Sequence, residues 1–214
     1  MVTAKGSYLV DFAAFISGSL FTTDYLAEAI KADPAYLAVD TASLRSALEA
    51  IAGAFPQSHN TNESQTEDDF IWPVLSALGW TASLRQQNLS VGGREDVPDG
   101  LLFADAGSKA AANAQDDQWK RYSHGLAVVE SKRWARPLDR ASGRGEATAP
   151  STQMLRYLRR IDDLTGGDLR WGILTNGKKW RLYWAGARSV SEEFLEIDLS
   201  RVLALDGSDD LSAD

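Results

Sequence analysis

The stretch "GLAVVESKRW", Gly125–Trp134, decides the centre of the fold. Its apolar run LAVV is short and unbroken, which is typical of a buried strand. Glu130 and Lys132 follow directly. Because residues two apart in a strand point to the same side, these two share one face, while Ser131 lies on the other. Charges beside a buried strand carry a desolvation cost, so they indicate either a solvated strand end or a site that does chemistry.

A second stretch, "EDVPDGLLF" (Glu95–Phe103), places Asp99 directly before an apolar run. If the two strands pair antiparallel, the start of one lies beside the end of the other, and Asp99 can meet Glu130 near Lys132. Two carboxylates can hold Mg²⁺, which prefers oxygen ligands, and such a metal activates water and neutralises developing charge. A lysine can orient the attacking water or stabilise the transition state. The pattern therefore favours hydrolysis of a phosphodiester.

The surrounding segments predict an α/β (α+β) architecture, a mixed β-sheet flanked by helices. Between the two central strands, the polar residues 106–124 are expected to form a hairpin insertion. An Asn-Gly turn predicts that two later strands form a hairpin. The remaining expected elements are helices at 66–78 and 151–165, strands at 81–89, 171–176 and 179–185, and a last edge strand in "EEFLEIDL", 192–199.

The sequence of the N-terminal region predicts helices that form an extension to the α/β domain. Residues 7–55 have apolar residues at helical spacing, with Thr41 as an N-cap, and the polar stretch 56–65 follows. We therefore expect a helical N-terminal extension over 1–60 and the α/β domain over 61–200. The acidic residues 201–214 are expected to be a tail or a chain boundary, with the natural protein continuing beyond them.

Composition narrows the possible chemistry. The chain has no cysteine and two histidines, which excludes disulfides and argues against a multi-histidine zinc site or a nucleophile–histidine triad. No apolar run is long enough to span a bilayer and no secretory signal is evident, so a cytoplasmic protein without membrane association is expected. The net charge is −8, yet residues 126–188 hold thirteen Lys and Arg against six Asp and Glu. This local excess of positive charge suits a phosphodiester substrate.

Taken together, the motifs resemble those of the PD-(D/E)xK nuclease superfamily. Pro98-Asp99 and Glu130-Ser131-Lys132 match its PD…ExK pattern, and Glu67 starts the helix before the sheet, where the superfamily often has an acidic residue. Gln153 and Tyr157, in "QMLRY", match the QxxxY motif of one branch. The resemblance covers roughly 63–198. It is to the N-terminal nuclease domains of restriction–modification proteins that fuse nuclease and methyltransferase, of the Type IIG or Type I-like kind.

The resemblance implies a restriction-endonuclease-like sheet and a Mg²⁺-dependent DNA endonuclease, with Mn²⁺ as a substitute metal. Asp99 and Glu130 would be metal ligands, joined by the backbone carbonyl of Ser131, and Lys132 would be the catalytic lysine. Glu67 would support the site, and Gln153 and Tyr157, four apart on one helix face, would contact the DNA backbone. The partners implied are double-stranded DNA and further methyltransferase and target-recognition domains or subunits of a phage-defence protein.

The same residues also have simpler structural interpretations. Pro-Asp-Gly is a strong turn signal by itself, and Glu130 with Lys132 could be a surface pair at a strand end. Glu67 could be an ordinary residue of a helix's first turn. A catalytically silent nuclease-fold module that binds DNA or a partner subunit is the main alternative function. Three arginines, Arg156, Arg159 and Arg160, either contact phosphates or form a solvated face with Asp162 and Asp163.

Overall fold

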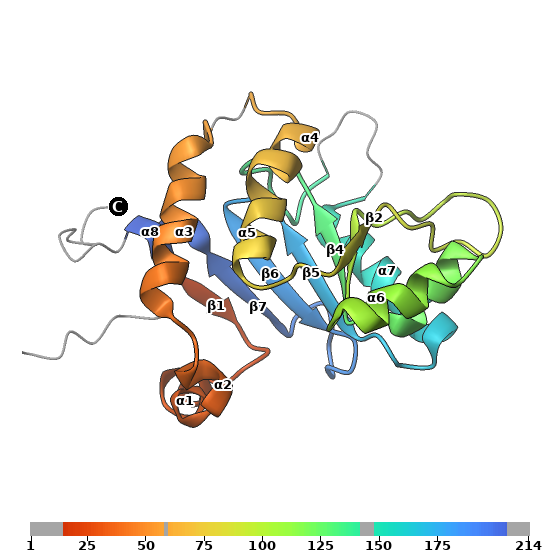
Figure 1. Ribbon diagram of the computed structural model, residues 1–214, viewed down its shortest axis with the longest axis horizontal. Helices are drawn as coiled ribbons and strands as arrows, with labels where there is room; N and C mark the ends of the chain where they lie inside the picture. Colours follow the sequence, from red (N-terminus) through yellow and green to blue (C-terminus); the bar gives the residue numbers. More distant parts are fainter. Residues whose placement is uncertain (1–14, 58–59, 142–147, 205–214) are drawn as a thin grey trace, which may run out of the picture.

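The structure is a computed structural model that describes residues 15–57, 60–141 and 148–204. Its centre is one mixed sheet of seven strands in the order β1-β7-β6-β5-β4-β3-β2 (Figure 1). The strands are β1 (Ile16–Gly18), β2 (Ser83–Arg85), β3 (Gly100–Leu102), β4 (Ala127–Ser131), β5 (Trp171–Thr175), β6 (Lys179–Trp184) and β7 (Phe194–Asp198). Only β4 and β5 are parallel neighbours; the other described pairs are antiparallel. The mixed α/β class expected from the sequence is confirmed.

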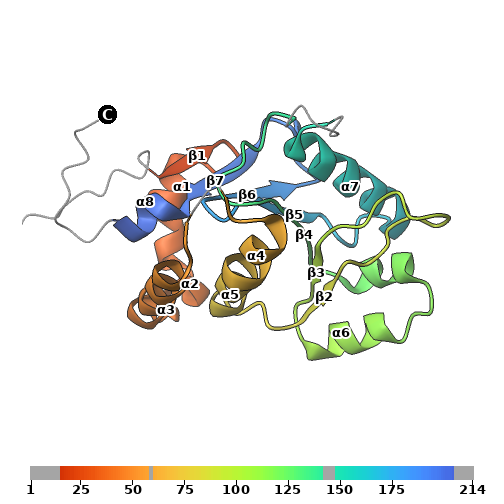
Figure 2. The same ribbon diagram turned by 90° about the horizontal axis from the view of Figure 1, so that it is seen from above.

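Helices cover both faces of the sheet (Figure 2). On one side lies α7 (Pro150–Thr165), whose Met154 and Leu158 pack with Val128 and Leu174 of the central strands. On the other lie α3 (Thr41–Ala54), α5 (Trp72–Ala77) and α8 (Leu199–Ala204), which pack with Val129 and its neighbours. Because side chains alternate along β4, Val128 faces α7 and Val129 faces α5. We call these the α7 face and the α5 face.

The N-terminal region differs from the prediction in one respect. The interpretation of residues 7–55 as helical is wrong at Ile16–Gly18, which form β1 and pair with β7. Consequently β7 is a strand, as predicted, but not the edge of the sheet. Gly18 has a φ of 96°, and a Cβ there would lie 1.9 Å from the carbonyl oxygen of Phe194. Only glycine lets the two backbones approach this closely, and helical periodicity cannot reveal it.

The other N-terminal elements are short except for α3. They are α1 (Thr23–Ala27), a 3₁₀ turn η2 (Ala29–Ala32) and α2 (Pro34–Leu37). The N-cap of α3 is Asp40, whose carboxylate accepts from the backbone N–H of Ser43, and not Thr41 as predicted. Residues 1–14, including the start of the expected extension, lie outside the described residues, as do 205–214 of the expected acidic tail; residues 201–204 belong to α8.

The helix that precedes the sheet contains a widened turn. It comprises α4 (Glu63–Thr66), a π-helical turn η3 (Glu67–Ile71) and α5. Pro73 follows the widened turn; its ring lacks an N–H and clashes with the carbonyl four residues earlier in a regular α-helix. A π-turn relieves that clash and re-aims the side chains within it, and Glu67 is the first of them.

The polar insertion is helical rather than a hairpin, so that expectation is wrong. It forms α6 (Ala106–Asn113) and a 3₁₀ segment η4 (Gln118–His124). Asp105 caps α6 by accepting from the N–H of Ser108, and the run of alanines that follows favours a helix. In the ranges that the structure describes, no helix is both long enough and apolar enough to cross a membrane.

Candidate active site

The two central strands meet as the sequence predicted. β3 and β4 are antiparallel neighbours, and Gly100 pairs with Val129, so Asp99 and Glu130 occupy the next position along the ladder. Oδ2 of Asp99 accepts from both the backbone N–H and the hydroxyl of Ser131, at 2.7 Å each. Asp99 is therefore not a free turn residue: it is held against the end of β4.

Glu67 reaches the same point from the α5 face. Its Oε1 lies 2.8 Å from Ser131 Oγ, and its Oε2 accepts from Arg85 at 2.6 Å. Asp99 and Glu67 thus both contact the Ser131 hydroxyl, which has a single proton to donate. The distance between their contacting carboxylate oxygens is therefore at most the sum of these two hydrogen-bond lengths. Burial raises the pKa of Glu67, and the charge of Asp99 raises it further. Glu67 is part of the cluster rather than a solvated first-turn residue.

Glu130 and Lys132 form a buried ion pair on the α7 face. Their side chains lie 2.5 Å apart, and the residues are 2% and 7% exposed. The interpretation of these residues as a surface pair is therefore wrong. Burial raises the pKa of Glu130 well above its ordinary value, and Asp99 adds to the effect. Burial by itself lowers the pKa of Lys132, but the Glu130 carboxylate outweighs it and holds that pKa above its usual range.

Neighbouring carboxylates contribute to both shifts. Asp99 acts on Glu130 and on the Lys132 ammonium, while Glu67 acts with Asp99 from the α5 face and pairs with Arg85, whose side chain is 42% exposed. An excess of negative charge in a poorly solvated place retains protons on acids and amines alike. The carboxylates of this cluster therefore outnumber the cationic side chains that neutralise them, so positive charge is lacking there.

A divalent cation would supply that charge, and the donor atoms present fit one. Oε2 of Glu130 is buried and has no hydrogen-bond partner among the described residues, a costly state for a carboxylate oxygen. Asp99 is partly exposed, so solvent and ligands reach it. Within the described ranges no group of three or more Asp, Glu or His side chains is arranged to hold a metal. Carboxylate ligation would thus rest on Asp99 and Glu130, with the Ser131 carbonyl and water as further oxygen donors.

The predicted residues on α7 lie beside this cluster. Gln153 Nε2 donates to the hydroxyl oxygen of Tyr157 at 2.6 Å, as residues four apart on one helix face can. Burial raises the pKa of Tyr157, and the nearby charge of Glu130 contributes next. Tyr157 is buried in the core with its hydroxyl toward the site, whereas Gln153 is half-exposed.

Two residues near the cluster, Arg85 and Asp96, were not indicated by any motif in the sequence. Arg85 of β2 binds both Glu67 and Asp68 and so ties the edge strand to the π-turn. Asp96 is buried and pairs with Arg156 and Arg160 of α7. Those two arginines therefore hold the loop before Asp99, rather than forming a face with Asp162 and Asp163.

Comparison with known proteins adds no assignment. Neither a protein-family model, nor a curated protein, nor a solved structure matches this chain. The functional argument therefore rests on the geometry of the cluster and on the motif resemblance.

Proposed function

We propose that this protein is a metal-dependent deoxyribonuclease that hydrolyses phosphodiester bonds of double-stranded DNA at the Asp99–Glu130–Lys132 cluster. The observation that carries the proposal is the buried Glu130–Lys132 pair: Glu130 Oε2 has no hydrogen bond from the described residues, and the charge of Asp99 acts on the Glu130 carboxyl. A buried ion pair adds little or nothing to stability compared with apolar residues. Its presence next to two further carboxylates is better explained by chemistry.

Asp99 and Glu130, with the carbonyl of Ser131, are the residues that would hold Mg²⁺, or Mn²⁺ in its place. When bound, the cation supplies an activated water and charge neutralisation at the phosphate. The Ser131 N–H and hydroxyl orient Asp99, and Glu67 steadies that hydroxyl from the other side.

Lys132 would act on the reacting phosphate or its attacking water. Its ammonium is held 2.5 Å from Glu130 Oε1 and stays protonated because its pKa is raised. A fixed cation where negative charge develops lowers the barrier without reorganisation. Gln153 would donate to a phosphate oxygen near the site, and the buried Tyr157 hydroxyl, which accepts from Gln153, fixes the direction of that amide.

The biological setting follows from the resemblance of the motifs. We infer a nuclease domain of a restriction–modification or phage-defence protein, acting on DNA in the cytoplasm together with methyltransferase and target-recognition domains or subunits. Nothing in the Asp99–Glu130–Lys132 cluster reads a base sequence, so specificity is assigned to those other parts.

The test is cleavage of plasmid DNA with Mg²⁺ or Mn²⁺ by the full natural protein, comparing wild type with Asp99→Asn and Lys132→Met. Each substitution should lower the rate by at least about 100-fold, the scale of losing one preorganised charged group, with folding intact by circular dichroism. Asp163→Asn, an exposed carboxylate on α7, is the matched control and should cleave normally. Cleavage that survives both site substitutions would refute the assignment.

One observation favours the alternative of a silent DNA- or subunit-binding module. The described residues include no group of three metal-ligating acidic or histidine side chains. If the wild-type protein binds DNA but never cleaves it with either metal, and the site variants bind equally well, the binding module replaces the nuclease.

A further inference from the structure

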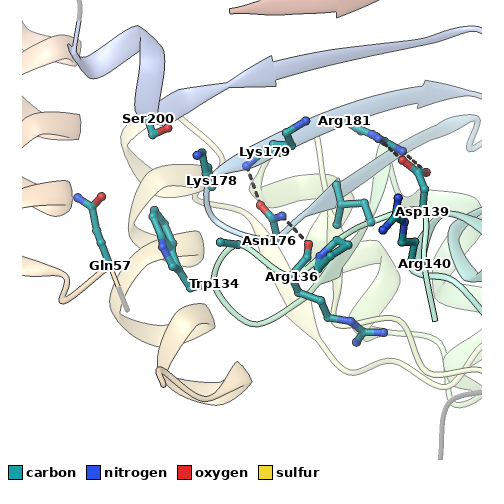
Figure 3. A pocket seen from close by; sticks show the side chains of 13 residues that line it. Gln57, Trp134, Arg136, Asp139, Arg140, Asn176, Lys178, Lys179, Arg181 and Ser200 are labelled. Carbon is teal, nitrogen blue, oxygen red and sulfur yellow. Dashed lines mark hydrogen bonds and ion pairs between the residues drawn. The ribbon is translucent and has the colours of Figure 1, made fainter. Parts of the chain in front are cut away.

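A basic pocket of about 540 Å³ lies next to the proposed site (Figure 3). Its walls come from the loop that follows Lys132, from the turn between β5 and β6, and from β6 itself. Figure 3 shows Lys178 and Ser200 toward one end and the ion pair of Asp139 with Arg181 toward the other. The proposed chemistry uses none of these residues.

The pocket is strongly positive in a protein of net charge −8. Five cations line it against a single carboxylate, Asp139, among the residues described; they are Arg136, Arg140, Lys178, Lys179 and Arg181. Lys179 and Arg181 are held at fixed positions by ion pairs with Glu196, and Arg181 also by Asp139. The cations therefore face the pocket from two sides: Arg136 and Arg140 come from the loop after β4, and the other three from the β5–β6 turn and β6.

Two of the cations have no anionic partner in the described part of the chain. The side chains of Lys178 and Arg140 form no ion pair or hydrogen bond there, and Arg140 is exposed. Lys178 and Arg140 lie toward opposite ends of the pocket (Figure 3), and an anionic ligand that reaches either one supplies the counter-charge that it lacks. The pocket thus has the electrostatic form of an anion-binding site.

Its polar groups do not suit the reading of bases. The Asn176 side chain is engaged on both ends: its Nδ2 donates to the Arg136 carbonyl and its Oδ1 accepts from the Lys179 N–H. Besides Gln57 and Ser200, what remains available among the polar lining side chains is positive charge. Contacts of that kind position a nucleic acid through its phosphates and carry no sequence information.

The pocket is rigidly connected to the proposed site. The N–H of Lys132 donates to the Thr175 carbonyl, and the N–H of Ala135 donates to the Asn176 carbonyl, so the loop and the β5–β6 turn are joined by backbone hydrogen bonds. Across the sheet, Glu130 pairs with Leu174 and Leu174 with Arg181. Arg181 therefore lies two strands from Glu130, about 10 Å at ~4.8 Å per strand.

We propose that this pocket binds a backbone phosphate of the DNA strand being cut, a few nucleotides from the scissile phosphate. A duplex strand advances ~3.4 Å per nucleotide along its axis and also winds around that axis, so successive phosphates are further apart than this rise and about 10 Å corresponds to at most roughly three nucleotides. The pocket is larger than one phosphate requires, which suits a continuous strand passing through it. This inference rests on the proposed function, since the scissile phosphate is placed at Glu130 and Lys132.

The test measures DNA binding separately from cleavage. Fluorescence anisotropy of a labelled duplex in EDTA gives the affinity and its salt dependence for wild type and for Lys178→Ala/Arg140→Ala. The double variant should bind at least about 10-fold more weakly, and its slope of log affinity against log salt should fall by about 0.9, the change expected for one lost phosphate contact. The matched control is Lys109→Ala/Arg188→Ala, which removes the same charges from residues that do not line the pocket.

Three outcomes decide the matter. Equal loss of affinity in both double variants would refute the pocket, because net charge alone would then explain it. Inorganic phosphate or a nucleoside triphosphate that protects Lys178 from chemical modification while the duplex does not would also refute it, and would make the pocket a site for free anions. Selective loss in the pocket variant supports it, even if the wild-type protein shows no cleavage, in which case the nuclease assignment alone fails.

Discussion

The strongest energetic prediction concerns the Glu130–Lys132 pair, examined by a double-mutant cycle with Glu130→Gln and Lys132→Met. The two groups are 2.5 Å apart and almost fully buried. Removing one partner leaves the other as an uncompensated charge in a poorly solvated place, which lowers the free energy of unfolding by about 3–5 kcal/mol. Replacing both with neutral groups of similar size removes the stranded charge, so the double variant should lie within about 1 kcal/mol of wild type, or be more stable.

The assay is urea unfolding followed by tryptophan fluorescence, which the seven tryptophans of the chain make practical. The coupling energy between Glu130 and Lys132 should therefore be about 5 kcal/mol or more. The exposed pair of Arg45 and Glu49 on α3 is the control and should couple by less than about 0.5 kcal/mol. Additive losses would show that the pair does not form. A double variant less stable than either single one would show that the pair is structural, and would remove the main argument for a catalytic role.

Three further predictions concern the surroundings of the site. Asp96→Ala should destabilise the protein by about 1–3 kcal/mol in urea unfolding, because a buried carboxylate that joins the Asp99 loop to α7 is lost while its arginine partners are free to regain water. Asp139→Asn should cost less than about 1 kcal/mol at pH 7, since Asp139 is 61% exposed. Arg181 lowers the pKa of Asp139 below its ordinary value of 3.8, so this difference should be constant above the ordinary carboxyl range and should be lost as the pH falls through the lowered pKa in acid titration of stability. Gly177→Ala should cost at least about 2 kcal/mol by thermal unfolding, because φ is +78° and the new Cβ would lie 2.6 Å from Trp134; an unchanged melting temperature would contradict the packing of that turn.

The central strands and the layout of the site could be predicted from the sequence. The apolar runs before Ser131 and after Asp99 leave little choice but buried strands, and the Asn-Gly turn sets the β5–β6 hairpin. The order of acidic and basic residues then brings Asp99, Glu130 and Lys132 together, which antiparallel pairing of β3 and β4 supports.

Features that depend on partners distant in the chain could not be predicted. β1 is a three-residue strand that exists because Gly18 can approach the backbone of β7. The ion pairs of Arg85 with Glu67 and of Asp96 with α7 depend on how elements are packed, and no local pattern encodes them. The Ser131 hydroxyl is a similar case: the motif gives a role to its carbonyl, whereas the structure uses its side chain to join two carboxylates.

Some features were indicated by the local sequence, but the sequence did not determine their structure. The cap at Asp105 and the alanines after it are good evidence for α6, yet the polarity of the segment led to the prediction of a hairpin insertion. Pro73 disfavours a regular α-helix around it, but sequence alone cannot show that the adjustment is a π-turn beginning at Glu67.

The central claim is that Asp99 and Glu130 hold a divalent cation, and an anomalous diffraction map of crystals soaked in Mn²⁺ tests it most directly. We expect a peak between Glu130 Oε2 and the Asp99 carboxylate, about 2.1–2.2 Å from each, with the Ser131 carbonyl nearby. In crystals of Asp99→Asn the peak should be absent or much weaker at the same Mn²⁺ concentration. A wild-type map without density at this position, or with Mn²⁺ bound only elsewhere, would contradict the account.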